Sequence, residues 1–203
     1  MSDYRTLPPA TMLSPVPAVL VSCRGVGEDA RPNALAVAWT GTVCSHPPMV
    51  SISLKPERYS FELIRQSGEF VINAADAAHA KALDHCGVRS GRDGDKLKAC
   101  GLEAVPMEGM ACAPRLEGFP MSLGCRLRQE IPLGSHVLML GEVTAVMIRD
   151  DLFDSDGSLH LERAGLVCYS HGVYQRASDV LGFFGWSVAR PEVYQRRMEA
   201  LGR

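Results

Sequence analysis

The stretch WTGTVCSHPPMVSISLKPERYS, residues 39–60, carries the pattern that decides the fold prediction. Within VSISLK (50–55), apolar and polar residues alternate, so three side chains fall on each face of a strand: Val50, Ile52 and Leu54 against Ser51, Ser53 and Lys55. Pro56 ends this strand, and Ser60 stands at the N-cap position of a helix that stops at Gly68. The stretch therefore predicts a half-buried strand that turns into a helix.

Polar and basic residues gather where this strand meets the helix. A helix N-terminus offers unpaired N–H groups and the positive end of the helix dipole. Capping alone would explain Ser60, and surface exposure alone would explain Arg58. Their coincidence with Lys55 and Ser53 indicates a site for an anion such as a phosphate.

The rest of the chain contains more strands than helices. Short aliphatic or β-branched segments between Gly, Pro and Asp turns predict strands at 17–23, 34–40, 50–55, 69–75, 121–131, 136–148 and 165–174. Helical spacing that ends at a glycine predicts helices at 60–68, 76–87 and 190–202. Because consecutive strands often lack a crossover helix, we expect a mainly β fold, an antiparallel barrel with flanking helices.

Length and composition favour one folded unit that binds a small molecule. The chain has 203 residues, 46% of them hydrophobic, and a net charge of −2. No basic cluster favours nucleic acid or an anionic membrane. No linker divides the chain, so we expect a single domain over 1–203, with a core at about 15–174 and a C-terminal extension at 175–203. No signal peptide or apolar span is evident, and we expect a cytoplasmic protein.

The seven cysteines are scattered singly, without a C-x-x-C pair. This spacing argues against a disulfide framework and against structural zinc. His79, His85 and Cys86 come nearest to a metal-binding group, but they also suit an ordinary helix face, and we predict no metal.

Three segments resemble the flavin reductase-like, FMN-binding split barrel family. PNALAVAWTGTVCSHPPMVSISLKPERYSFELIRQSGEFVIN (32–73) shows the family's strand, loop, PP, strand and helix opened by a hydroxyl residue. GRDGDKLKACGLE (91–103) is similar to its D-K-x-x-x-x-G-L segment, and IPLGSHVLMLGEVTAV (131–146) to its G-D-H-x-x-x-x-G-x-V strand. The resemblance runs from about Pro15 to Tyr174 and implies an antiparallel split β-barrel, nearest to the family's small electron-transfer proteins.

The resemblance implies a homodimer that binds FMN at the barrel edge. By similarity, Ser60 and Lys96 would bind the phosphate, helped by Lys55, Arg58 and Tyr59. The ring and ribityl chain would lie along Asn33, Trp39, Thr40 and Gly41, with Ser53 and Leu54 from the next strand. His136 and Tyr169 would complete the ring environment.

Several of these residues also have plainer interpretations. Trp39 suits a core aromatic and Asn33 a turn residue after Pro32. Lys96 in DKLKACG suits a solvated helix lysine, and His136 suits a hydrogen-bonded strand histidine. The sequence departs from the family at Ser135, where Asp is common, and at Ser60, where Thr is common; neither change removes a group that FMN binding needs.

The resemblance implies an FMN-containing oxidoreductase that passes electrons through bound FMN, with a redox partner protein or NAD(P)H as donor. We assign no catalytic residue. An NAD(P)H-dependent flavin reductase that uses FMN as an exchangeable substrate is one alternative; no G-x-G-x-x-G marks a Rossmann domain, although the family dispenses with one. A non-catalytic ligand-binding barrel is another, and a thiol redox sensor is disfavoured by the absence of paired or basic-flanked cysteines. Phe183, Phe184 and Trp186 have no assigned role beyond packing across a dimer or covering the ring.

Overall fold

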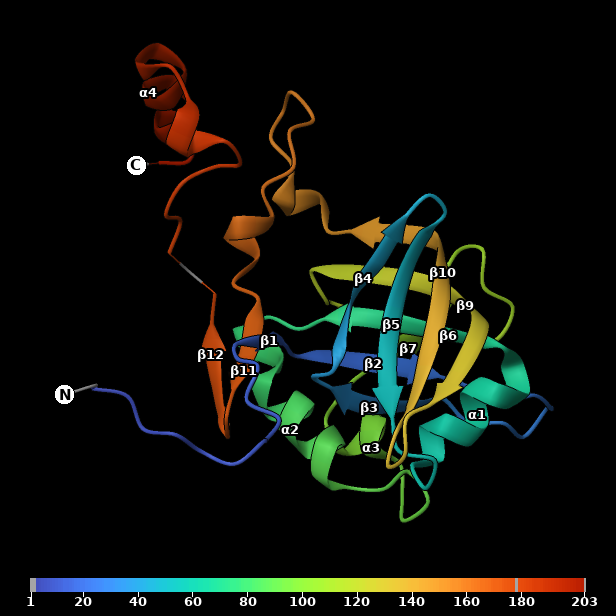
Figure 1. Cartoon of the computed structure of the whole chain (residues 1–203). Helices are drawn as coiled ribbons and strands as arrows, with labels where there is room; N and C mark the ends of the chain where they lie inside the picture. Colours follow the sequence, from blue (N-terminus) through green and yellow to red (C-terminus); the bar gives the residue numbers. More distant parts are fainter. Residues whose placement is uncertain (1–2, 178, 203) are drawn as a thin grey trace.

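Seven antiparallel strands form the central sheet of the computed structural model, which describes residues 3–177 and 179–202 (Figure 1). The order across the sheet is β3-β2-β6-β9-β10-β5-β4. The strands are β2 (Val19–Cys23), β3 (Asn33–Val37), β4 (Thr40–Ser45), β5 (Pro48–Leu54), β6 (Glu69–Ala74), β9 (Met121–Pro132) and β10 (Val137–Ile148). The backbone N–H of Ser53 in β5 donates to the carbonyl of Trp39 at 2.9 Å, which draws the segment after β3 towards β5. The predicted antiparallel split barrel is confirmed.

Strand β5 shows how the alternating pattern builds the core. Its residues Val50, Ile52 and Leu54 are buried, whereas Ser51 and Ser53 on the other face stay partly exposed. The buried face packs in one cluster with Phe70 of β6 and with Phe61 of α1 (Tyr59–Ser67). Each such aliphatic side chain contributes about 1.5–3 kcal/mol by leaving water.

The long strands β9 and β10 cross the sheet as one hairpin whose register shifts at two points, between Leu140 and Gly141 and between Val143 and Ala145. At the first shift, a Cβ on Gly141 would lie 2.5 Å from the ring of Phe70. Phe70 is fully buried, so only glycine lets this strand pass over the ring.

Helices cover one side of the barrel, near β2 and β3 (Figure 1). They are α1, α2 (Ala80–Val88) and the short α3 (Lys96–Ala99); a 3₁₀ turn, η1 (Ala77–His79), precedes α2. The helix predicted at 76–87 therefore exists, but its first turn is 3₁₀, held by the side chain of Asp76, which accepts from the backbone N–H groups of Ala78 and His79.

Two smaller sheets complete the strands. One joins β1 (Val16–Pro17), β11 (Val167–Ser170) and β12 (Val173–Arg176), and the other joins β7 (Ala104–Val105) and β8 (Arg115–Leu116). The single strand predicted at 165–174 was wrong: the chain reverses at His171 and Gly172, which both have positive φ values, 42° and 95°. Such a pair of residues forms the tight turn of a hairpin.

Strand β4 replaces the loop that the sequence predicts after the strand at 34–40. That strand ends at Val37, and the chain resumes as β4 at Thr40. Thr42 and Val43 are both exposed, so the segment lacks the one-sided burial that marks a strand. Its backbone pairing with β5 holds it instead.

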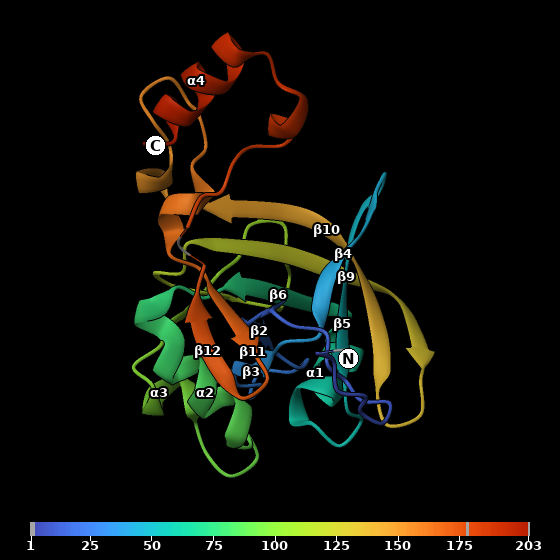
Figure 2. The ribbon, with the colours of Figure 1, turned by 60° about the vertical axis from the view of Figure 1, so that its left-hand side comes forward.

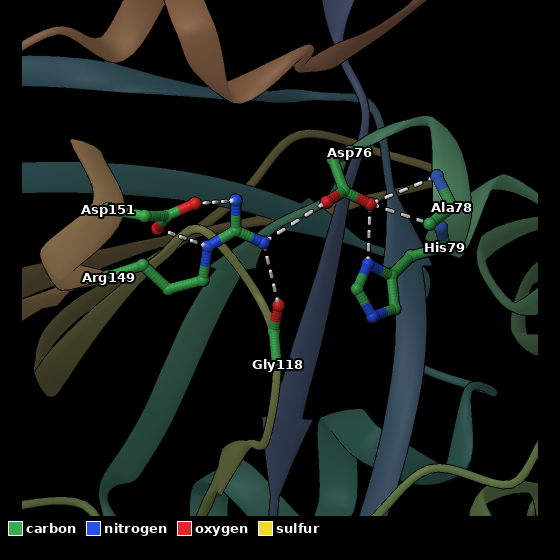
Figure 3. A network of polar contacts seen from close by, with 6 residues as sticks. All are labelled: Asp76, Ala78, His79, Gly118, Arg149 and Asp151. Carbon is green, nitrogen blue, oxygen red and sulfur yellow. Dashed lines mark hydrogen bonds and ion pairs between the residues drawn. The ribbon is translucent and has the colours of Figure 1, made fainter.

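A polar network fastens the chain after β10 to the start of η1 (Figure 3). Arg149 donates to both carboxylate oxygens of Asp151 at 2.9 and 3.0 Å, to the Gly118 carbonyl at 3.3 Å and to Asp76 at 3.5 Å. The other oxygen of Asp76 lies 2.6 Å from Nδ1 of His79. Two 3₁₀ turns follow, η2 (Asp150–Leu152) and η3 (Leu161–Ala164).

The C-terminal segment stands off the barrel (Figures 1 and 2). It contains η4 (Trp186–Val188) and α4 (Pro191–Ala200), which confirms the helix predicted near 190–202. Within it, the Tyr194 ring lies 6.1 Å from that of Phe183 and 6.4 Å from that of Trp186. Among the described residues, no helix has the length and apolar character needed to cross a membrane.

Candidate functional site

Two adjoining cavities lie along the barrel edge between β3 and the end of β5. Their volumes are about 180 and 230 Å³. Leu35, Lys55 and Arg58 line both, so the two form one groove. The groove has a cationic end, towards α1 and the loop 89–92, and an aromatic end, towards Trp39 and His136.

Four basic side chains and one carboxylate line the cationic end: Lys55, Arg58, Arg89, Lys96 and Glu57. The carboxylate lies 3.8 Å from Nζ of Lys55, and both side chains are largely exposed, so their attraction is weak. The excess of positive charge makes this end suited to an anion.

Ser60 lies inside α1 and not at its cap. The helix begins at Tyr59 with Arg58 as N-cap and without a side-chain capping bond, so the predicted N-cap role of Ser60 was wrong. The Ser60 hydroxyl is buried, and its oxygen accepts a 2.8 Å hydrogen bond from Nδ2 of Asn33. Because the oxygen serves as acceptor here, its proton is free to donate into the cavity.

The first turn of α1 adds two donors to the same end. Within residues 3–177 and 179–202, the backbone N–H groups of Tyr59 and Ser60 have no acceptor, as is usual for the first turn of a helix. Both residues line the cavity.

Lys96 is a buried cation rather than a solvated one. Its Nζ donates to the carbonyls of Cys86 and Arg89, each at 3.2 Å, near the C-terminus of α2. An ammonium has three protons, so one remains for a ligand. Burial lowers the pKa of Lys96, although the nearby Cys86 and Cys23 thiols act in the opposite direction and Arg58 adds to the lowering. An anion in the cavity would offset that burial cost.

The loop 89–92 completes the cationic end, although it was not among the residues predicted from the sequence. Arg92 holds the loop: it donates to the Glu57 carbonyl at 2.9 Å, and its guanidinium lies 5.1 Å from the Tyr59 ring centroid. Gly91 packs so closely on Asn33 and Tyr59 that a Cβ would overlap them. A glycine between basic residues directly after a helix, as in VRSGRDGD (88–95), was the signal available in the sequence.

The aromatic end is built around Trp39. Its side chain is 45% exposed, which excludes the core role that was its plainer interpretation. Its ring lies 4.6 Å from the ring of His136, at an interplanar angle of 43°. Ser53 and Leu54 of β5 line the same cavity. A half-exposed indole beside an imidazole can accept a flat ring ligand.

The remaining predicted residues lie further out. Thr40 and Gly41 line a third cavity, which shares Ala38, Trp39 and Ser53 with the aromatic end. Asn33 lies at the cationic end, whereas the resemblance placed it along the ring and ribityl chain.

Tyr169 lies outside this groove. It lines a fourth cavity, which shares Ala36, Val37 and Ala38 with the aromatic end. Tyr174 lines this cavity too, and its hydroxyl donates to Asp84 at 3.3 Å. Burial, and next Asp84, raise the pKa of Tyr174 to about 12. All the other predicted site residues line the groove or the third cavity.

The cysteines and histidines form no further reactive centre in the described part of the chain. It holds no group of three or more His, Cys, Asp or Glu residues arranged for a metal ion. His79, for example, is paired with Asp76 and stacked on Phe119 at 4.0 Å. Burial raises the pKa of the Cys23 and Cys86 thiols to about 12, although both face Lys96, so neither is an activated thiolate.

Residues 12–178 match the family model of the flavin reductase like domain. Among solved structures, the fold is similar to a flavoredoxin of Desulfovibrio vulgaris (Miyazaki F), with a TM-score of 0.83 and 28% identity over 92% of this chain and 100% of that one. It is also similar to an FMN-binding domain of a flavin reductases-like enzyme from Shewanella baltica, with a TM-score of 0.70 and 27% identity over 82% of this chain and 88% of that one. The FMN reductase (NADH) RutF of Cronobacter sakazakii is 26% identical over 59% of this chain and 71% of its own length.

Proposed function

Because the chain belongs to the flavin reductase-like family and is a flavin-related oxidoreductase, we propose that it carries FMN in the groove and passes electrons through it. The sequence resembles the small electron-transfer proteins of the family, and the fold is similar to that of a flavoredoxin. This similarity supports an electron carrier rather than a flavin reductase.

One observation carries this proposal: four donors of three kinds converge on the cationic end. The Ser60 hydroxyl, the third proton of Lys96, and the backbone N–H groups of Tyr59 and Ser60 all border the same cavity. A phosphate monoester accepts several hydrogen bonds and carries up to two negative charges. The donor set therefore fits the phosphate of FMN.

The aromatic end fits the other part of the cofactor. Trp39 offers a flat apolar face, and Ser53 and His136 offer hydrogen-bonding groups next to it. FMN, when bound, supplies the redox chemistry; the protein supplies position, electrostatics and exclusion of water. In this arrangement Asn33 orients Ser60, and Arg58 and Arg89 neutralise the phosphate.

The absorption spectrum of the purified protein tests the proposal. We expect visible flavin bands that survive dialysis, and their loss in a Ser60→Ala/Lys96→Met double variant that still folds. Lys98→Met is the matched control, because Lys98 lies exposed on the same short helix, and it should retain FMN. A protein that leaves the absorption and fluorescence of added FMN unchanged would refute the proposal and leave a ligand-binding barrel.

The similarity to the NADH-dependent FMN reductase RutF favours a second candidate, a reductase with exchangeable FMN. The two functions differ in flavin exchange. Rapid oxidation of NADH or NADPH on addition of free FMN, with flavin lost on dialysis, would support the reductase. Bound FMN with slow turnover of either nucleotide would support the carrier, with a redox partner protein as donor or acceptor.

We also propose that the chain forms a homodimer. Large apolar side chains stay exposed on the C-terminal segment, among them Leu181, Phe184 and Val188. Such side chains gain free energy when a second surface covers them. Light scattering on the eluted protein should give twice the monomer mass of 22.0 kDa.

A further inference from the structure

The third cavity continues the groove beyond its aromatic end and has walls of a different character. It has a volume of about 600 Å³ and lies between the N-terminal segment 10–16 and strand β4. Ala38, Trp39 and Ser53 belong to both this cavity and the aromatic end, so a ligand here would reach the same indole.

No charged side chain lines this cavity in the part of the chain that the structure describes. Its apolar walls include Met12 and Leu13 from the N-terminal segment and Leu138 from β10. The basic residues Lys55 and Arg58 line both cavities of the groove, including the one at the aromatic end, but not the third cavity. The third cavity is therefore uncharged although it adjoins a charged groove.

Hydroxyl groups provide the polar contacts of the third cavity. Within residues 3–177 and 179–202, the side chains of Thr40 and Thr42 form no hydrogen bond, and both border the cavity. A hydroxyl can donate to a carbonyl oxygen. An apolar pocket with a few such groups is typical of sites for small, flat, neutral ligands.

We propose that the third cavity binds a neutral aromatic carbonyl compound of the quinone class, as the electron acceptor of the proposed function on which this inference rests. The reduced flavin would supply two electrons and one proton to the quinone, and water would supply the second proton, so that each carbonyl oxygen becomes a hydroxyl. It would leave as a hydroquinone, with the flavin oxidised. A nicotinamide dinucleotide is disfavoured here, because the cavity offers no cation to its pyrophosphate.

Calorimetric titration with 2,3-dimethyl-1,4-naphthoquinone, whose substituted quinone ring resists addition of the free cysteine thiols, tests the binding step without relying on turnover. The protein is used as purified, with its FMN content measured, and again after saturation with FMN. We expect saturable binding that Met12→Asp weakens at least about tenfold, because the ligand would have to desolvate a carboxylate. Leu7→Asp is the control: Leu7 is an exposed N-terminal leucine outside the cavity, and its replacement should leave the affinity unchanged.

A second variant, Thr42→Glu, places the charge on the opposite wall at an exposed position, in case Met12→Asp lowers the melting temperature. Loss of quinone affinity in both variants would support the proposal. Equal affinity in wild type and both variants, absence of binding, or displacement of the quinone by equimolar NADH would overturn it. A protein that binds the quinone but no FMN would refute the proposed function while leaving the ligand of this cavity assigned.

Discussion

Replacing Gly91 with alanine tests whether the cationic end depends on the close packing of loop 89–92. A Cβ at this position would overlap Oδ1 of Asn33 and lie 2.9 Å from Cδ1 of Tyr59. Carbon atoms in contact are ordinarily about 3.5–4.0 Å apart, so the loop or its neighbours must shift by roughly 1 Å. Gly91 has no positive φ, so the effect is one of space and not of backbone strain.

Two consequences follow from that shift. Overpacking costs about 1–3 kcal/mol, which lowers the melting temperature of a chain of this size by roughly 2–12 °C. Displacing Asn33 also removes its hydrogen bond to Ser60 and turns the hydroxyl away from the phosphate. A hydrogen bond to a charged group is worth about 1.5–3 kcal/mol, so the dissociation constant of FMN should rise at least about tenfold.

Gly94→Ala is the matched control, because Gly94 lies in the same region of the chain, has no positive φ, and would carry a Cβ that meets no other atom within 4 Å. Thermal melts and flavin fluorescence titrations on both variants give the comparison. If Gly91→Ala matches Gly94→Ala in melting temperature and FMN affinity, the loop is not packed on Asn33 in this way and the reasoning fails.

Three further predictions concern buried ionisable groups. Lys96→Met should lower FMN affinity at least about tenfold, but leave the weaker binding of riboflavin, which has no phosphate, unchanged by fluorescence titration. Burial lowers the pKa of Lys96, so the free protein should lose the ammonium charge at a lower pH than an exposed lysine would. The FMN affinity of the wild type should therefore fall as the pH rises through that range, and Lys96→Met should not show this pH-dependent fall. Glu69→Ala should cost about 3 kcal/mol in chemical denaturation, because the buried carboxylate accepts from the backbone of the 111–113 loop, while FMN affinity stays within about twofold. Burial raises the pKa of Cys23, Cys86 and Cys125 to about 12 from 9.0, so the folded state holds protons that the unfolded state releases. The contribution of these thiols to the free energy of unfolding should therefore be complete below pH 9 and be lost between pH 9 and 12, by up to ~1.4 kcal/mol per pH unit for each thiol. In denaturation experiments at several pH values, Cys125→Ala should make this decline shallower.

The sequence predicts the fold well where burial is one-sided. The alternation in β5 appears directly as buried Val50, Ile52 and Leu54, because each faces one hydrophobic core. Strand β4 was missed because both its faces are exposed and its order comes from backbone pairing to β5, which no local pattern encodes.

The sequence predicted which residues belong to the candidate site better than it predicted the contacts that each of them makes. Ser60 was chosen from the local pattern and then through the family resemblance, Lys96 through the resemblance alone, and both do line one cavity. Local patterns misplaced both: Ser60 was expected at an N-cap, and Lys96 alone suited a solvated helix. Tertiary contacts decide these cases, since Asn33 reaches Ser60 and the C-terminal carbonyls of α2 enclose Lys96.

The cationic end is assembled from three separate parts of the chain: residues 33–35, residues 55–60 and the 89–96 segment. None of these parts can hold a phosphate alone, so the site exists only after the barrel has closed and α2 has docked on β3. FMN would therefore bind only late in folding. It would slow the local opening of the 89–96 segment but would not affect the earlier folding steps. At a free FMN concentration 100-fold above the dissociation constant, FMN binding would add about 2.7 kcal/mol to the free energy of unfolding. A cell short of FMN would then contain a folded barrel in which this one segment lacks its ligand contacts.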